Sequence, residues 1–348
     1  MEARREVYAE SFLRKKLLKW KLVLSYLSIA LILTVVTSLA IGPIYIPPEK
    51  ILKIIYETVA GVPHSDPKYA EIILQIRLPR ALMGVLVGGI LAVAGAVMQG
   101  LFRNPLAGPY ILGVSSGAAL GAALSITLLP AMMGVYTTPI AAFIGGCASI
   151  FLVYNIVKLS RGGFRSETLL LAGISVAYLF SAILSMVIWL ATEDSHMILV
   201  WVMGGLSSAD WLKVETIAPV MLVGLVLAYS FSRDLNAILL GEETAQSLGI
   251  NVQRVEKILP IIVSLIVSAA VSFSGAIGFV GLMMPHIMRR IVGPDHRILI
   301  PASALAGAIF LTAADSLARC LLEIPVGVIT SLSGVPFFIY LLRRSRAP

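Results

Sequence analysis

The chain has 348 residues, of which 58% are hydrophobic and only 13% carry a charge. Soluble domains carry roughly twice that share of charged residues, so the composition excludes an ordinary soluble protein. The net charge of +8 would suggest a nucleic-acid partner in a soluble protein, but in a membrane protein we interpret it as cytoplasmic Lys and Arg and expect no nucleic acid.

The first predicted element is a membrane span at residues 22–42, preceded by a basic segment at 1–21. A cleaved secretory signal is the competing interpretation. The apolar run is longer than the hydrophobic region of a typical signal peptide. We therefore predict that it is retained as a span and that the basic segment is cytoplasmic.

Apolar runs long enough to cross a hydrocarbon core of ~30 Å recur along the whole chain. We predict an all-α polytopic membrane protein, with one transmembrane domain at 22–342 and a short cytoplasmic tail at 343–348. Its ten predicted transmembrane helices are residues 22–42, 81–101, 111–129, 137–157, 168–190, 212–232, 258–275, 277–292, 299–319 and 325–342.

The number of spans depends on residues 258–292, which are too long for one crossing. Helix-breaking residues interrupt them, namely Gly275, Gly278, Gly281 and Pro285. We therefore divide this segment into two spans. With ten spans and a cytoplasmic N-terminus, 20 of the 27 Lys and Arg residues lie in cytoplasmic segments, as the positive-inside rule requires. Both termini are then cytoplasmic.

The predicted span at 81–101 carries small residues at every fourth position, which a helix places on one face. They are Gly84, Gly88, Ala92, Ala96 and Gly100, and a second run, Gly113, Gly117 and Gly121, opens the next span. In lipid, small residues allow two helix backbones to approach closely. These two spans are therefore predicted to pack tightly against other helices.

Two of the predicted outer segments are long. Residues 43–76 form a proline-containing loop, and residues 191–211 contain Trp201 and Trp211. Tryptophan is enriched where membrane meets water, so we predict a short interfacial helix in the second segment.

The inner segment 233–257 is the most polar stretch after the N-terminus. Glu242 and Glu243 suit the first turn of a helix, where the helix dipole favours acids, and Gly249 suits its C-terminal end. The predicted surface helix is either an idle part of a solvated loop or a docking helix for a soluble partner. Spacing alone favours neither interpretation.

Motifs for catalysis or cofactor binding are absent from the sequence. It has no G-x-x-x-x-G-K-[ST] loop for ATP, and its four histidines lack metal-ligand spacing. We therefore expect no catalytic residue, no bound cofactor and no metal site. The acid Asp315 lies inside an apolar run, but close to its outer end, whereas ion-coupled carriers place ionisable groups in the middle of the membrane. It also stands four residues before Arg319, so a local ion pair is the simpler interpretation.

Several stretches, in unbroken order between about residues 20 and 345, resemble the permease subunits of type II ABC importers for iron-siderophores, haem and cobalamin, the FecCD and BtuC-like family. These stretches are 77–80, 95–107, 112–117, 169–173, 201–205, 241–249, 275–282, 285–286 and 295–297. The resemblance implies a multi-pass permease of a prokaryotic cell (inner) membrane, in contact with lipid and without enzymatic activity. Its implied partners are a second permease subunit, most simply an identical one in a homodimer, two ABC ATPase subunits that bind ATP and Mg, and an extracytoplasmic substrate-binding protein.

The resemblance also assigns roles to residues. It implies ATPase coupling for Gly241, Glu242, Glu243, Ala245, Leu248 and Gly249, binding-protein docking for Arg77, Arg80 and Arg319, and a cytoplasmic gate for Asn104, Pro105, Leu106, Ser166 and Glu167. Snorkelling of the arginines and simple turn formation at Asn104 and Pro105 are the structural alternatives. The chain departs from the broader importer pattern, because Thr244 replaces its first Ala and Ile258 directly precedes the Leu-Pro pair.

An iron-siderophore is the expected substrate because that class is the commonest in the family. Cobalamin, haem and an oxyanion such as molybdate are the alternatives. A secondary transporter driven by an ion gradient is the alternative from a different class, and the shortage of acids in the middle of the spans argues against it. A membrane scaffold that transports nothing would leave the segment 241–249 unexplained.

Overall fold

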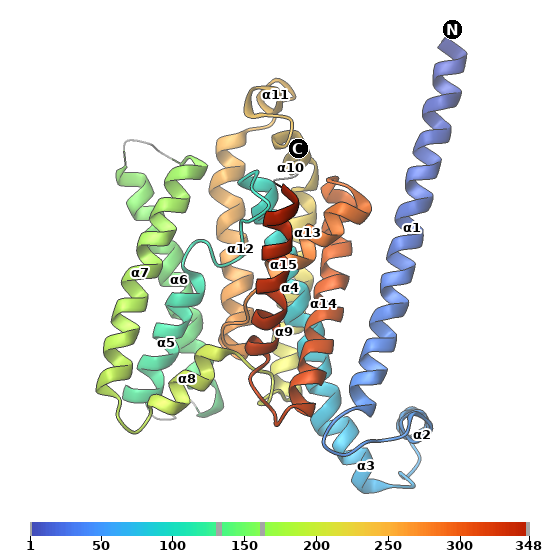
Figure 1. Ribbon diagram of the computed structural model, residues 1–348, viewed down its shortest axis with the longest axis vertical. Helices are drawn as coiled ribbons and strands as arrows, with labels where there is room; N and C mark the ends of the chain where they lie inside the picture. Colours follow the sequence, from blue (N-terminus) through green and yellow to red (C-terminus); the bar gives the residue numbers. More distant parts are fainter. Residues whose placement is uncertain (1, 130–133, 161–163, 346–348) are drawn as a thin grey trace.

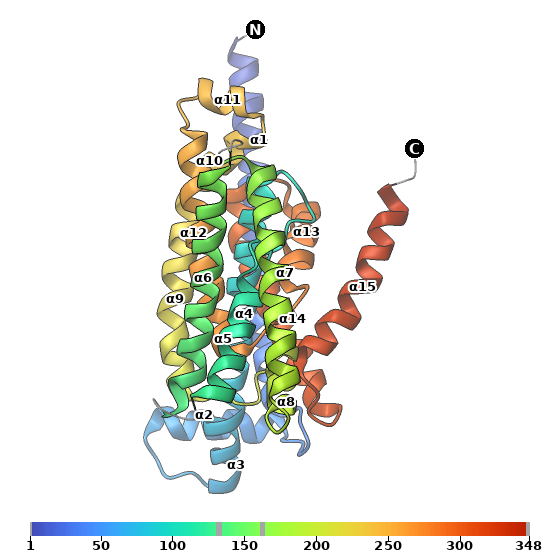
Figure 2. The same ribbon diagram turned by 90° about the vertical axis from the view of Figure 1, so that its left-hand side faces the viewer.

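The computed structural model describes residues 2–129, 134–160 and 164–345. Within these ranges every regular element is a helix, and the long helices run side by side in one bundle (Figure 1, Figure 2). Seven helices are long and apolar enough to cross a membrane. They are α1 (Glu2–Ala40), α4 (Leu78–Leu101), α6 (Thr137–Leu159), α7 (Ser166–Leu190), α9 (Trp211–Ser230), α12 (Val252–Ser274) and α14 (His296–Cys320). The chain is therefore an all-helical membrane protein.

Three further helices occupy the remaining predicted spans. Each is shorter than those seven helices or has a shorter apolar part. They are α5 (Val114–Leu128), α13 (Val280–Val292) and α15 (Val326–Ser345). The predicted break within 258–292 is confirmed, because α12 ends at Ser274 and α13 begins at Val280. Gly275 makes the turn with a φ of 66°, a left-handed backbone that glycine adopts without steric cost.

Short helices lie in the connecting segments. They are α2 (Pro48–Ala60), α3 (Pro67–Glu71), a π-helix (Ile72–Arg77), a 3-10 helix (Gly134–Tyr136), α8 (Ser195–Met203), α10 (Ser232–Ile238) and α11 (Glu242–Ser247). Both short helices predicted from the sequence are confirmed, as α8 and α11. From residue 2 onward the predicted basic segment 1–21 is helical and continuous with the first span, and its cytoplasmic location stays a prediction.

Helix α4 forms the centre of the bundle. Its most apolar window is 83% buried inside the chain, compared with 17% for α1 and 22% for α7. The stripe of small residues explains this position, because it brings backbones together. A Cβ atom built on Gly88 would lie 2.3 Å from the carbonyl oxygen of Gly307, and one on Gly95 would lie 1.6 Å from that of Gly281. The predicted tight packing of this span, against α13 and α14, is confirmed.

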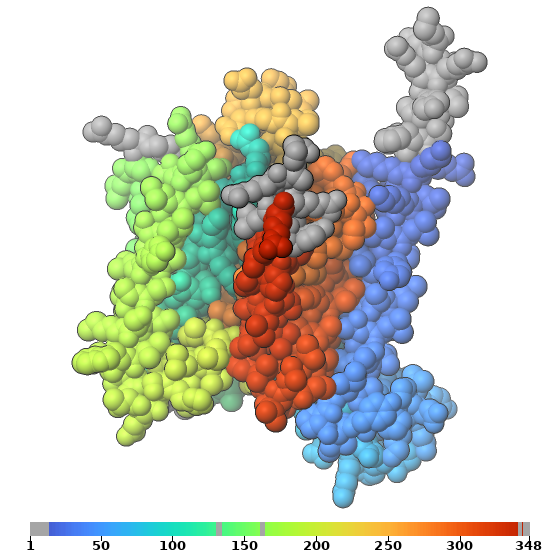
Figure 3. All heavy atoms as spheres, in the orientation of Figure 1, coloured from blue at the N-terminus to red at the C-terminus, as the bar shows by residue number. Residues whose placement is uncertain are grey.

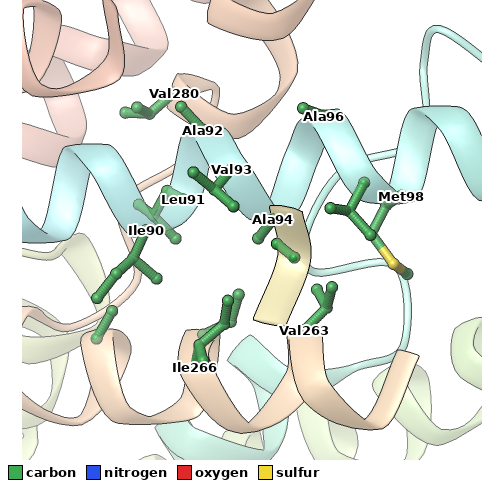
Figure 4. Packing of buried hydrophobic residues seen from close by; sticks show 14 of the residues in the cluster. Ile90, Leu91, Ala92, Val93, Ala94, Ala96, Met98, Val263, Ile266 and Val280 are labelled. Carbon is green, nitrogen blue, oxygen red and sulfur yellow. The ribbon is translucent and has the colours of Figure 1, made fainter. Parts of the chain in front are cut away.

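The second run of glycines packs α5 against α6 in the same way. A Cβ atom on Gly117 would lie 2.3 Å from the carbonyl oxygen of Gly145, and one on Gly121 would lie 2.2 Å from that of Ala141. Larger apolar side chains fill the space on the other sides of α4. Figure 4 shows part of this core, with Ile90, Leu91, Val93 and Met98 of α4 near Val263 and Ile266 of α12.

The peripheral helices expose much of their apolar surface. Helix α7 lies at one edge of the bundle and α1 at the opposite edge, and α15 lies in front of the middle of the bundle (Figure 1, Figure 3). On α7 the exposed side chains include Leu171, Tyr178 and Trp189. Such surfaces suit contact with lipid or with another membrane subunit.

Candidate functional site

The candidate residues divide between two ends of the bundle (Figure 1). We call the end that carries α11 the α11 end, and the end that carries α2 and α3 the α3 end. The predicted coupling and gate residues lie at the α11 end, and the three predicted docking arginines lie toward the α3 end.

Helix α11 has the ends that the sequence predicts. Gly241 precedes it with a φ of 111°, and Gly249 follows its last turn with a φ of 84°, so glycine permits both turns. Glu242 and Glu243 occupy the first turn, where the helix dipole stabilises acids. Ala245 is fully buried and attaches the helix to the bundle.

The outer face of α11 is open to a partner. Leu248, which follows its last helical residue, is 62% exposed. Figure 1 shows α11 projecting at the extremity of the bundle. A single exposed leucine is common on protein surfaces, so it is the projecting position of α11 that suits the docking interpretation better than an idle loop. The role of α11 in coupling stays a prediction.

The neighbouring helix α10 is joined to the bundle by a polar cluster around Asp295. Asn236 donates from Nδ2 to Oδ1 of Asp295 at 2.9 Å, and Lys16 of α1 donates to Oδ2 at 3.2 Å. The backbone N–H of His296 donates to Oδ1 of Asn236 at 2.8 Å. Hydrogen bonds, above all from the Arg297 side chain, hold the pKa of Asp295 well below its usual range. This cluster connects α1, α10 and the start of α14.

The first predicted gate segment forms a compact turn after α4. Asn104, Pro105 and Leu106 are all exposed. The side-chain oxygen of Asn104 accepts a hydrogen bond from the N–H of Leu106 at 2.9 Å, the arrangement by which asparagine stabilises turns. The turn-forming interpretation of Asn104 is therefore observed, and the gate role stays a prediction beside it.

The second predicted gate segment opens α7. Ser166 donates from Oγ to Oε1 of Glu256 on α12 at 3.3 Å, and Glu167 is exposed. Glu256 is itself 8% exposed. The gate segment is thus attached to the helix that directly follows α11.

The structure adds Arg103, which sequence reasoning did not single out as a site residue. It lies between α4 and the first gate segment, and its guanidinium forms an ion pair with Glu242 of α11. Its φ of 49° is left-handed, an unusual conformation for a residue with a side chain. Its position beside Asn104 was visible in the sequence, but its contact with a residue 139 positions away was not.

Toward the α3 end, the three predicted docking arginines are buried. Arg77, Arg80 and Arg319 are 4%, 7% and 5% exposed, so the snorkelling alternative, with guanidinium groups in water, is wrong for this structure. Arg77 donates to the carbonyl oxygens of Leu39 at 2.6 Å and Ala40 at 3.1 Å. It also donates to the carbonyl of Ile44. Arg77 thus closes the C-terminal end of α1.

Asp315 is shared by the other two arginines. Its Oδ2 lies 2.9 Å from Nε of Arg80 and 3.4 Å from Nε of Arg319. The predicted pair with Arg319 within α14 is confirmed, and Arg80 of α4 is a second partner that local spacing could not reveal. Arg319 also donates to the carbonyl oxygen of Ser38 at 2.9 Å. The cluster therefore joins α1, α4 and α14.

One exposed acid reaches this cluster. Oε1 of Glu323 lies 3.7 Å from Nη1 of Arg80, and the Glu323 side chain is 56% exposed. A carboxylate from outside the chain could replace Glu323 with little loss, because that side chain is still largely hydrated. Docking at the three arginines stays a prediction, and any docked acid would meet groups already bound within the chain.

No metal-binding group is found in the described part of the chain, where His, Cys, Asp and Glu never gather in threes. A mainly apolar groove of about 580 Å³ lies between α8 and α15. It is lined by Val202, Met203, Gly327, Ser331 and Leu332, among others. Such a lining offers shape and apolar contact and few polar groups for a tight site.

Comparison with known proteins gives consistent similarities. The FecCD transport family matches residues 30–344. The cobalamin import system permease protein BtuC of Halobacterium salinarum is 47% identical over 279 residues, which cover 80% of this chain and 75% of that protein. The hemin transport system permease protein HmuU of Yersinia pestis is 38% identical over 333 residues, covering 94% and 96%.

A solved structure shows the same fold. It is described as a metal-chelate type ABC transporter in an inward-facing conformation. The match has a TM-score of 0.81 and 32% sequence identity, and it covers 92% of this chain and 99% of the solved chain. The arrangement of helices in Figure 1 is therefore shared with a transport protein over almost its whole length.

Proposed function

The chain belongs to the FecCD transport family, and we propose that it is the permease subunit of a type II ABC importer for iron complexes, haem or cobalamin. The observation that carries the proposal is the match to the solved metal-chelate type ABC transporter chain, at 32% identity over 99% of that chain. The chain supplies the translocation path and binds neither ATP nor metal itself. Separate ATPase subunits bind ATP and Mg and hydrolyse the ATP.

The proposed topology has ten transmembrane helices and cytoplasmic termini in a prokaryotic cytoplasmic membrane. Seven helices satisfy the length and hydropathy of a span, and α5, α13 and α15 provide the other three. The distribution of Lys and Arg supports this orientation. In this proposed orientation the α11 end lies in the cytoplasm and the α3 end lies outside.

The proposed partners follow from that orientation. ATPase subunits bind at α11, a substrate-binding protein binds at the α3 end, and a second permease subunit, most simply a second copy, completes the path. The exposed apolar faces of α7 and α15, with the groove between α8 and α15, support a membrane partner on that side. Few of the exposed α7 side chains are polar, which suits passage of a bulky chelate.

The proposed substrate is an iron-siderophore, with cobalamin, haem and molybdate as alternatives. The named relatives differ among themselves, since one is a cobalamin and one a hemin permease. Reconstitution decides the question. The chain, the ATPase subunits and the binding protein from neighbouring genes would be placed in liposomes, and ATPase stimulation would be screened with ferric siderophores, haem, cobalamin and molybdate.

Stimulation by one ligand, lost when α11 is disrupted, supports both the mechanism and that substrate. Failure of the chain to assemble with any ATPase subunit would contradict the proposal. An ion-coupled transporter would instead show uptake that resists ATP depletion and is abolished by an uncoupler. The position of Asp315 argues against that alternative, because its carboxylate is 2% exposed and both of its cationic partners, Arg80 and Arg319, belong to the chain itself.

A further inference from the structure

We propose that Arg103 is a positioning residue that joins the coupling helix α11 to the gate segment 104–106 through its ion pair with Glu242. The inference rests on the proposed function, because it requires α11 to contact the ATPase and 104–106 to act as the gate. Through this one side-chain contact, a movement of α11 would be transmitted directly to the gate segment 104–106.

The turn that carries Arg103 is short and internally hydrogen-bonded, so displacement of Arg103 moves the gate segment with it. The N–H of Asn104 donates to the carbonyl of Gln99 at 3.2 Å, and the N–H of Ala107 donates to that of Asn104 at 3.0 Å. The left-handed φ of Arg103, 49°, costs free energy and persists only where the surroundings hold it. The backbone hydrogen bond from Asn104 to Gln99 spans Arg103 and holds this conformation at the end of α4.

The second gate segment is attached on the same side. Ser166 bonds to Glu256, and Arg103, Glu242 and Glu167 are all close enough to influence the charge of Glu256. Arg103 is thus a cation near two carboxylates, in direct contact with Glu242 and within electrostatic range of Glu256. Its removal leaves the like charges of Glu242 and Glu256 to repel one another between α11 and α12, the helix to which the second gate segment is attached.

The pair is placed to break and reform. The side chains of Arg103 and Glu242 are 38% and 52% exposed, so water competes for both groups and the pair contributes little to stability. A contact that opens in each transport cycle needs this property. A buried pair, such as Arg80 with Asp315, would resist opening.

The test is a charge-swap series in liposomes that contain the full complex of permease, ATPase subunits and binding protein. ATP hydrolysis is measured together with uptake of radiolabelled cobalamin, ferric citrate, a ferric hydroxamate and haemin. We expect Arg103→Glu to lower uptake per ATP hydrolysed about tenfold while the ATPase subunits still co-purify. The double variant Arg103→Glu with Glu242→Arg should recover to within about threefold of wild type, as expected for residues whose effects are coupled.

Glu243 provides the matched control. It is the neighbouring acid in the same turn of α11, and in the described part of the chain it forms no ion pair. Glu243→Arg combined with Arg103→Glu should show no recovery. Equal recovery with either acid, or no recovery with Glu242→Arg, would overturn the inference.

The outcomes separate this inference from the function on which it rests. A wild-type complex that fails to couple ATP hydrolysis to uptake of any probe overturns both. A wild-type complex that transports, with Arg103→Glu equally active, overturns the inference alone. If Glu242→Arg prevents ATPase binding, the single Arg103→Glu and Arg103→Lys variants carry the test, since Arg103 lies outside α11. Arg103→Lys keeps the positive charge and should retain most of the uptake.

Discussion

Helix α4 has an arginine at each end, and the two are held in opposite ways. Arg80, near the α3 end, pairs with Asp315 at 2.9 Å, and their side chains are 8% and 2% exposed. Arg103, just beyond the α11 end, pairs with Glu242, and these side chains are 38% and 52% exposed. One end of α4 is therefore fixed by a buried ion pair. At the other end the ion pair is exposed, so water can replace either partner.

The difference follows from what each pair loses when it is broken. A buried charge left without its partner pays its full desolvation penalty, so the buried cluster is fixed. An exposed charge returns to water at little cost. The α3 end thus has the contacts of a stable scaffold, and the α11 end has those of a moving part. Four substitutions test this comparison, beginning with the largest expected effect.

Asp315→Ala should have the largest effect on stability. It leaves Arg80 and Arg319 buried beside each other without their shared carboxylate, and removal of one partner from a buried ion pair costs about 3–5 kcal/mol. Unfolding of the purified chain in detergent measures the loss. Asp66→Ala is the control, since Asp66 pairs with Lys50 at 3.1 Å where both side chains are well exposed, and it should cost under about 1 kcal/mol. Equal effects would show that the α3 end is not fixed.

Gly88→Ala tests the close packing of α4, the helix that connects the two ends, against α14. The new Cβ atom would lie 2.3 Å from the carbonyl oxygen of Gly307, so α4 and α14 must separate, at a cost of about 1–3 kcal/mol for overpacking. Gly205→Ala is the control, because its nearest neighbour would be 3.9 Å away. The same unfolding measurement applies. A neutral Gly88→Ala would mean that close backbone contact does not hold α4 in place.

Asp295→Asn examines the polar cluster at the α11 end. Hydrogen bonds, first from Arg297, lower the pKa of Asp295, so the carboxylate stabilises the fold above its unfolded pKa of about 3.9 and loses this contribution as the pH falls toward the folded pKa. We expect Asp295→Asn to cost about 1 kcal/mol at pH 7, a value reduced for partial exposure. Its unfolding free energy should also decline less than that of wild type between pH 5 and pH 3. Parallel curves for the two proteins would contradict this account.

The features of the fold that could be predicted are those that depend on the spacing of residues close together in the sequence. The stripe from Gly84 to Gly100 predicted tight packing of α4, and the breakers after residue 274 predicted the gap before α13. Glu242 and Gly249 marked the ends of α11. Each of these features depends on residues within one helix or turn, so it can be inferred from a single sequence.

The charge contacts between distant residues could not be predicted in this way. Asp315 had a partner four residues away in Arg319, but its second partner, Arg80, is 235 positions away. The burial of Arg77, Arg80 and Arg319 could not be predicted from the sequence either, because arginines near the ends of apolar runs are expected to reach water. Only the tertiary arrangement of α1, α4 and α14 brings acceptors to them.

Arg103→Ala should have the smallest effect on stability and gives the sharpest form of the comparison. Both members of its pair are well exposed, so the unfolding free energy should change by less than about 1 kcal/mol. A double-mutant cycle of Arg103→Ala with Glu242→Ala, measured by unfolding in detergent, isolates the energy of this contact. This coupling energy should be small and should weaken further as salt rises, because exposed charges are screened.

The corresponding cycle for Arg80 and Asp315 should give a larger coupling energy with little salt dependence, since buried pairs are screened much less. Similar values from the two cycles would remove the distinction between a fixed end and an exchangeable end. A small coupling energy for Arg103 with a large loss of coupled transport would place its importance in movement and not in folding.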